Sequence, residues 1–382
     1  MLLIVLAQFL CTSLWFAGNG VSFDIIRAFQ LNIKATSLLT SSVQFGFILG
    51  TLSFAVLSIT DLFSPSKIFF ICAVFGSIFN LGLLFDNNTL VSLIVFRFLT
   101  GFSLAGIYPI GIKIAADYFS KGLGKSLGWL VGALVLGTAF PHYLKLISTQ
   151  YSWQYVIIIP SVLALIGGIL VYLYIPKGPF FTSNNKANFK NLISIFKNQR
   201  FVKAAIGYFG HMWELYAFWT FIPLILGIYN KMHPQVNLSI PLYSFIIIGS
   251  GAIACILAGY LSVIFGTLKT ATFFLIASGC CCIISPFIFS VNPSLFLSFL
   301  IFWGCVVIAD SPLFSTLIAI NTTNQTKGTA ITIVNCIGFT ISILSIQLLS
   351  YLQSHTNKNY IFLILAIGPI IGIRSLILKT RT

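Results

Sequence analysis

Long apolar runs, separated by short polar or turn-forming segments, account for nearly the whole chain. A helix needs about 20 apolar residues to cross the hydrocarbon core of a bilayer, and this length predicts twelve membrane-spanning helices. The first run is interpreted as a membrane helix and not as a cleaved signal, because no basic residue precedes it. The predicted spans are residues 2–22, 37–59, 67–85, 89–114, 124–146, 154–175, 201–227, 241–265, 271–290, 294–319, 328–350 and 360–378.

The longest polar stretch, residues 176–200, falls between the sixth and seventh predicted spans. It is rich in Lys and Asn and contains no acidic residue. Its position predicts an N-terminal six-helix bundle over 1–175, a basic cytoplasmic linker over 176–200 and a C-terminal six-helix bundle over 201–382. An interfacial amphipathic segment around 189–196 is compatible with this division. We therefore expect an all-α integral membrane protein built as two pseudo-symmetric six-helix bundles.

Composition supports the membrane interpretation. The chain is 58% hydrophobic and 7% charged, whereas about a quarter of the residues in a soluble domain are charged. Intrinsic disorder is excluded, because 38 Phe, 14 Tyr and 6 Trp supply too much apolar surface. The eight Cys residues all lie inside apolar runs and show no metal-ligand spacing, so we expect no metal and no cofactor.

The net charge of +15 comes from Lys and Arg in short loops, without a continuous basic stripe. This placement favours anchoring at the membrane over binding to nucleic acid, and it sets the orientation. With the N-terminus inside, fifteen basic residues lie on the inner side: Lys67, Lys113, Lys121, Lys125, Lys177, Lys186, Lys190, Lys197, Arg200, Lys203, Lys269, Lys327, Arg374, Lys379 and Arg381. Five lie outside: Arg27, Lys34, Lys145, Lys231 and Lys358. Both termini are predicted to be cytoplasmic.

Residues 97–106 read Arg-Phe-Leu-Thr-Gly-Phe-Ser-Leu-Ala-Gly and resemble the fourth-helix motif of the major facilitator superfamily of secondary transporters. Residues 61–67 occupy the place of the family's cytoplasmic signature, where Asp61 and Lys67 are kept while Leu62 and Ser64 replace its usual Arg and Gly. The matching loop of the second half, 259–266, keeps its glycines but has no acid. The resemblance implies alternating access around a cavity lined by helices one, four, seven and ten.

Arg97 lies within the fourth predicted span, where a charge costs several kcal/mol and therefore needs a role. One alternative is that it binds an anionic substrate or a nearby carboxylate. The other, implied by the resemblance, is a part in proton coupling or in architecture. The sequence leaves both open.

Glu214 and His211 lie in the seventh span, three residues apart and hence on one helix face, with Tyr208 a further turn back. A carboxylate and an imidazole in a low-dielectric cavity can exchange protons, which favours proton coupling or substrate contact. A structural hydrogen-bonded pair is the alternative. Asp310 in the tenth span precedes Ser311 and Pro312, which predicts a kinked helix.

We expect one translocation site on helices one, four, seven and ten. Its candidate residues are Asn19, Arg97, Tyr108, His211, Glu214 and Asp310. A second set is predicted to serve gating or conformational change: Asp61, Gly101, Gly106, Asp117, Gly137 and Pro141. Asp117 is expected at an inner gate or in a surface ion pair with Lys113 or Lys121. In the fifth span Pro141 does not directly follow a Gly, so the family's antiporter pattern is not met.

No phosphate-binding glycine loop and no large extramembrane segment occur, so an enzyme is not expected. The sequence predicts a secondary active transporter that moves a small polar or anionic metabolite across the bacterial plasma (inner) membrane, coupled to protons or another ion. A monomer is expected, since each chain can form its own pathway. The alternatives are a drug or metabolite exporter of the same fold and a non-transporting membrane sensor.

Overall fold

The computed structural model describes residues 1–57, 59–118, 123–148, 152–176, 178–179, 196–322 and 327–377, without the side chains of residues 60, 61, 116, 123–125 and 327. The chain divides into two compact units, Met1–Lys186 and Ala187–Thr382. Their boundary falls inside the predicted linker 176–200, most of which lies outside the described residues.

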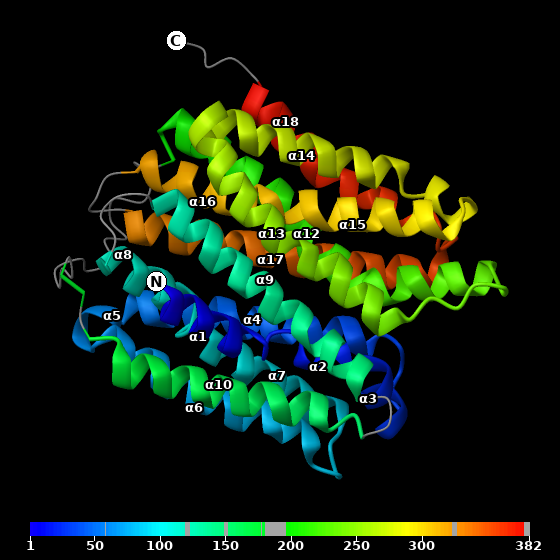
Figure 1. Ribbon diagram of the computed structural model, residues 1–382, viewed down its shortest axis with the longest axis horizontal. Helices are drawn as coiled ribbons and strands as arrows, with labels where there is room; N and C mark the ends of the chain where they lie inside the picture. The colour runs from blue at the N-terminus through cyan, green and yellow to red at the C-terminus, as the bar shows by residue number, and fades with distance from the viewer. Residues whose placement is uncertain are drawn as a thin grey trace. The chain divides into compact units, whose positions relative to one another are not determined.

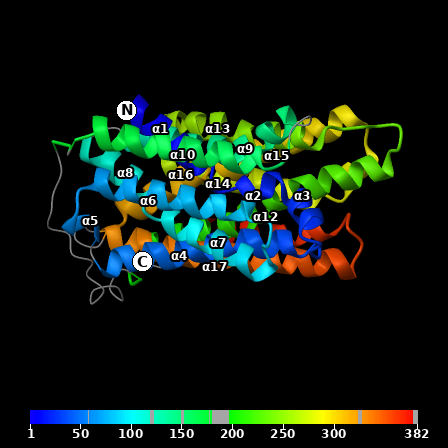
Figure 2. The same cartoon turned by 90° about the horizontal axis from the view of Figure 1, so that it is seen from below.

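The first unit holds the helices of the first six membrane spans (Figure 1). In chain order they are α1 (Leu2–Thr12), α2 (Ala17–Gly20), α3 (Ser22–Ala28), α4 (Ala35–Val56), α5 (Ile59–Leu62), α6 (Pro65–Leu81), η1 (Gly82–Leu84), α7 (Leu90–Leu104), α8 (Tyr108–Tyr118), α9 (Leu123–Ile147) and α10 (Tyr155–Tyr174). Helix α10 packs along α6 and α1, while α4 packs along α7 (Figures 1 and 2).

The second unit repeats this arrangement with the remaining spans. Its helices are α12 (Gln199–Met232), α13 (Ile240–Phe265), α14 (Thr267–Ile284), η3 (Phe287–Ser290), α15 (Pro293–Ala309), α16 (Ser311–Ile320), α17 (Lys327–His355), η4 (Ile361–Ala366) and α18 (Ile367–Ile377). The pairing α13 with α15 corresponds to α4 with α7, and α12 packs against α17 and α18 as α1 packs against α9 and α10.

Within the described residues, ten helical stretches are long and apolar enough to cross a membrane, and the helices Leu2–Thr12 and Ile361–Ile377 are shorter apolar ones at the two ends. These account for all twelve predicted spans. The predicted all-α fold of twelve membrane helices in two six-helix bundles is confirmed.

The first, fourth and tenth of the spans that the pattern predicts as single helices are interrupted in mid-span. The first breaks at 13–16, between α1 and α2, the fourth at 105–107, between α7 and α8, and the tenth at Asp310, between α15 and α16. Pro109 and Pro312 lie in the first turn of the helices that resume, a position that proline favours because its fixed φ suits a helix start. The hydropathy pattern does not reveal these breaks, because the residues on both sides of each break are apolar.

Glycines allow the closest helix approaches in both units. A Cβ added to Gly101 of α7 would stand 1.9 Å from the Val43 carbonyl oxygen of α4. The corresponding contact in the second unit brings Gly304 of α15 against Ile247 of α13, at 2.1 Å for the added Cβ. Backbones therefore touch directly at the same place in each bundle, as small residues permit in membrane interfaces.

Other predicted conformational residues also lie at such contacts. A Cβ on Gly106 would meet the Cys72 sulfur at 2.2 Å, and one on Gly137 of α9 would meet the Thr12 hydroxyl at 2.3 Å. Pro141 lies inside α9 and faces Gly20, where an added Cβ would meet the Pro141 Cβ at 2.9 Å. These contacts explain the small residues by packing, and a conformational role for them stays a prediction.

Gly101→Ala should lower the thermal unfolding temperature of the purified protein, because the added methyl must push α4 and α7 apart. Overpacking of this kind costs about 1–3 kcal/mol. Gly227→Ala in α12 is the matched control, since its nearest neighbour would lie 3.8 Å away and Ala favours a helix. An unfolding temperature equal to wild type for Gly101→Ala, measured by differential scanning fluorimetry in detergent, would contradict this packing.

Candidate functional site

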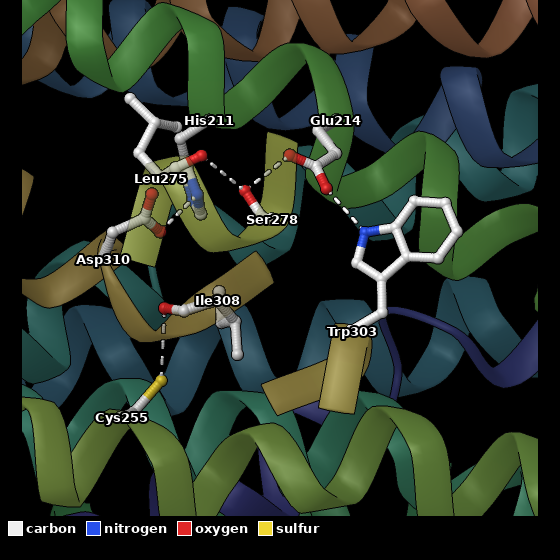
Figure 3. Close-up of polar contacts among 8 residues, drawn as sticks. All are labelled: His211, Glu214, Cys255, Leu275, Ser278, Trp303, Ile308 and Asp310. Carbon is white, nitrogen blue, oxygen red and sulfur yellow. Dashed lines mark hydrogen bonds and ion pairs between the residues drawn. The ribbon is translucent and has the colours of Figure 1, made fainter. Parts of the chain in front are cut away.

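Glu214 lies in the middle of α12, and its side chain is 1% exposed (Figure 3). Trp303 of α15 donates its Nε1–H to Glu214 Oε1 at 2.6 Å. Ser278 of α14 donates its hydroxyl to Oε2 at 2.9 Å and also lies 3.2 Å from the Leu275 carbonyl oxygen. The Cys282 thiol of α14 makes a further hydrogen bond to the carboxyl group. Both carboxyl oxygens therefore have donors from neighbouring helices.

His211 lies one turn before Glu214 on α12 and pairs with Asp310, with Nδ1 2.7 Å from Oδ1 (Figure 3). Both side chains are buried, at 1% and 0% exposure. In the described part of the chain, none of the four polar side-chain atoms of the pair makes a hydrogen bond of full geometry, so the contact between Nδ1 and Oδ1 is a close ion-pair approach. The rings of Tyr208 and Phe314 flank the imidazole, with centroids 5.9 and 6.4 Å away. His211 Nε2 and Asp310 Oδ2 take no part in this contact and have no hydrogen-bond partner among the described residues either.

The break in the tenth span explains how Asp310 comes to lie in the bundle interior. Pro312 has no N–H, so the Ile308 carbonyl loses its usual helical donor. The Cys255 thiol of α13 donates to this carbonyl at 3.5 Å. Asp310 itself accepts the first backbone hydrogen bonds of α16, from Leu313 and Phe314, at its carbonyl oxygen. The kink predicted from Ser311 and Pro312 is therefore present, and it directs the Asp310 side chain toward α12.

The second unit thus gathers two carboxyl groups and one imidazole from α12 and the α15–α16 break. Asp310 and Glu214 also lie close enough to interact electrostatically. In the described part of this unit no Lys or Arg forms an ion pair with either acid. Two buried acids without a Lys or Arg partner in a water-poor interior are a place for exchangeable protons, because burying an uncompensated charge is costly.

Arg97 of α7 lies in the first unit, and its side chain is buried at 1% exposure. Its Nη1 donates to the Leu14 carbonyl at 3.1 Å and to Asn80 Oδ1 at 3.2 Å, and its Nη2 donates to the Trp15 carbonyl. Leu14 and Trp15 belong to the break between α1 and α2, so the guanidinium supplies donors to backbone groups that the interrupted helix leaves open. The two terminal nitrogens are used inside the protein.

Asn80 extends the Arg97 contacts to the sixth span. Its Nδ2 donates to the Ile157 carbonyl at 3.2 Å and to Ser161 Oγ at 3.0 Å, both on α10. Ser77 of α6 donates to the Ser161 carbonyl at 2.7 Å. The first, third, fourth and sixth spans are therefore joined by one buried polar network centred on Arg97.

The predicted translocation residues fall into both units. Glu214, His211 and Asp310 come together in the second unit. Arg97 lies in the first unit, as do the other two candidates: Asn19 donates to Thr40 Oγ1 of α4 at 2.7 Å, and Tyr108 is half-buried at the start of α8. The assignment of these six residues to one substrate site stays a prediction.

The acidic candidates for gating lie near the predicted inner ends. Asp61 belongs to the short helix α5, and its side chain lies outside the described residues. Asp117 lies near the end of α8, where burial raises the pKa of its carboxyl group and the nearby Lys113 opposes this shift. Lys121, the other predicted partner, lies outside the described residues. Asp24, at the outer end of the first span, forms a half-exposed ion pair with Lys145 of α9 at 2.7 Å.

Sequence reasoning missed Trp303, Ser278 and Asn80, which hold the charged groups in place. An indole N–H or a side-chain amide inside an apolar span needs a hydrogen-bond partner. The presence of such residues in the predicted spans therefore indicates buried hydrogen bonds. The identity of that partner depends on helix packing, which one sequence does not reveal.

Arg97→Lys should destabilise the protein even without solute, because a single ammonium does not replace the fork that joins two carbonyls and Asn80. Hydrogen bonds to a charged group contribute about 1.5–3 kcal/mol each. Arg27→Lys is the control, since Arg27 is exposed. Thermal unfolding in detergent measures the effect. Wild-type stability in Arg97→Lys, combined with lost solute binding, would instead assign Arg97 to the solute.

Comparison with known proteins finds structures that are similar over nearly the whole chain and a protein that is similar in sequence over one segment. The structure of the proton:xylose symporter XylE bound to 6-bromo-6-deoxy-D-glucose matches with a TM-score of 0.74 at 13% identity, over 98% of this chain and 93% of that one. A variant of the nucleoside transporter NupG matches with a TM-score of 0.73 at 14% identity, over 98% of both chains. At these identities the likeness shows the fold alone.

A curated relative shares sequence over part of its length. The efflux pump FUB11 of Gibberella moniliformis is 31% identical over 140 residues, which are 36% of this chain and 23% of that protein. The family model described as Major Facilitator Superfamily matches residues 3–346. Because this match covers nearly the whole chain, and the fold agrees with it, the protein belongs to the major facilitator superfamily.

Proposed function

We propose that this protein is a proton-coupled secondary active transporter for a small polar metabolite. The membership of a transporter superfamily implies a small-molecule substrate and a place in the membrane. The kind of solute, the identity of the coupling ion and the location in the bacterial plasma membrane are parts of this proposal. The anionic solute that the sequence allowed loses support, because the terminal nitrogens of Arg97 bind backbone carbonyls and Asn80.

The observation that carries the proposal is the buried acid cluster of the second unit. Glu214 is held by neutral donors from Trp303 and Ser278, without a basic partner among the described residues. An ionised carboxylate there is costly while the site is closed to water, and a proton removes most of that cost. Proton binding would therefore change the relative stability of conformations that differ in the hydration of the cluster. This is the coupling that alternating access needs.

The known relatives give this proposal a context. One structural neighbour is by its title a proton:xylose symporter and another a nucleoside transporter. Both titles name small polar solutes. The similarity supports the fold in which such solutes are carried and leaves the solute of this chain to experiment.

Glu214→Gln should abolish uphill accumulation in proteoliposomes while solute exchange stays measurable, since Gln has the same shape and does not take up a proton. The solute is first identified by thermal shift against pooled polar metabolites, because ligands stabilise the folded state that binds them. Asp24→Asn is the control, since Asp24 pairs with Lys145 near the surface. Unchanged proton-driven accumulation in Glu214→Gln would contradict a role of Glu214 in proton coupling.

Export is the second candidate function, favoured by the segment shared with an efflux pump. It predicts stabilisation by bulky lipophilic cations in the same thermal-shift experiment, with Glu214 or Asp310 as the counter-charge. A non-transporting sensor would show no flux of any stabilising compound.

The proposal includes an orientation and an oligomeric state. The excess of basic residues on one predicted side supports a cytoplasmic location of both termini. Each chain is proposed to work as a monomer, because two bundles suffice for one pathway.

Green fluorescent protein fused after Thr382 should fluoresce in a bacterial host, and alkaline phosphatase at the same position should be inactive. The reason is that the first reporter matures in the cytoplasm and the second in the periplasm. Phosphatase fused in the loop after Asp86, predicted to be external, is the control. An active phosphatase after Thr382 would reverse the orientation.

A further inference from the structure

The two buried acids of the second unit differ in how many of their hydrogen-bonding positions are already used. Both oxygens of Glu214 accept hydrogen bonds, from Trp303 and from Ser278. Asp310 contacts the imidazole of His211 through Oδ1, while its Oδ2 and the Nε2 of His211 have no partner in the described part of the chain. The open positions of the cluster therefore belong to the His211–Asp310 pair.

We propose that this pair is a second proton-binding site, separate from Glu214, in which Asp310 positions His211 and the Nε2 atom takes up the proton. The inference rests on the proposed function, since it assigns another proton to the same coupled cycle. Glu214 remains the carboxyl whose protonation drives accumulation.

The contact between Nδ1 and Oδ1 favours one tautomer of the imidazole. Since Nδ1 lies 2.7 Å from Oδ1, an ionised Asp310 favours a neutral His211 that carries its proton on Nδ1. The other ring nitrogen then carries a lone pair, because a neutral imidazole has a single N–H. Nε2 is thus the basic atom, and a buried carboxylate on Nδ1 fixes both the ring and its tautomer, as in acid–histidine dyads of enzymes.

Proton uptake then needs no rearrangement of the pair. A proton from water forms an Nε2–H bond, which converts the imidazole to imidazolium while Asp310 keeps its negative charge. The pair changes from a net charge of −1 to zero, so its burial becomes less costly. On release the Nε2–H bond breaks and the proton returns to water.

The surroundings contain few groups that could compete for this proton. On α12 itself Tyr208 and Glu214 lie beside His211. The titratable groups near the acids are thiols: Cys255 of α13, Cys281 and Cys282 of α14, and Cys305 of α15. Helix α16 contributes Phe314, α17 carries Cys336, and Arg374 of α18 is exposed. In the described part of the chain, none of these groups makes a hydrogen bond to Nε2 of His211.

Nitrogen-15 NMR of histidine-labelled full-length protein in nanodiscs tests the proposal without a solute. The chain has 4 His, and His211→Gln assigns the signal of His211 by its loss. At alkaline pH the wild-type protein should show His211 with its proton on Nδ1 and a bare Nε2. Lowering the pH should protonate Nε2. A neutral His211 with its proton on Nε2, or no titration of Nε2 between pH 5 and pH 9, would overturn the proposal.

Two variants separate this site from Glu214. Asp310→Asn should shift His211 toward the Nε2–H tautomer, because the amide donates to Nδ1, and Asp310→Ala removes the acceptor altogether. An unchanged tautomer in both variants would show that Asp310 does not position the ring. Protonation of His211 should still be observed in Glu214→Gln. The NMR result for the His211–Asp310 pair is therefore independent of the accumulation result for Glu214, and failure of one can be told from failure of the other. The wild-type spectrum decides the tautomer even if a variant does not fold.

Discussion

Every polar group inside this protein must find its partner within the protein, because the lipid offers none. The structure meets this constraint at several points where a membrane helix is interrupted or a charge is buried. Arg97 donates to the carbonyls of the broken first span, and Cys255 donates to the carbonyl that Pro312 leaves open. Trp303 and Ser278 donate to Glu214. In the described part of the chain, the polar atoms of the buried His211–Asp310 pair have no hydrogen-bond partner, and the same constraint makes them informative about function.

The two bundles share one packing scheme and use it for different chemistry. Backbone contacts at Gly101 and at Gly304 hold corresponding helix pairs together. In the first bundle the buried charge is a cation whose donors are largely consumed by the fold. In the second bundle the buried charges are acids whose donors are neutral. We therefore regard the second bundle as the half that binds protons, which fits a duplicated fold whose halves have diverged.

Much of the fold could be predicted from the sequence, since twenty-residue apolar runs leave a membrane protein little choice. The count of twelve spans, the two bundles and the family were correctly predicted. The breaks at 13–16 and 105–107 were missed, because apolar residues continue through both and hydropathy does not register backbone geometry. For the site, the adjacency of His211 and Glu214 followed from helical spacing. The His211–Asp310 pair and the contacts of Trp303 depend on packing between helices and could not be read from one sequence.

The central claim is that Glu214 binds and releases a proton inside the second bundle. Infrared spectroscopy of the protein in lipid tests it most directly, because a protonated carboxyl absorbs separately from a carboxylate and no solute is needed. The account predicts a protonated-carboxyl band in the wild-type protein that disappears as the pH is raised and is missing from Glu214→Gln. A band that persists in Glu214→Gln, or the absence of any titrating band, would contradict the account.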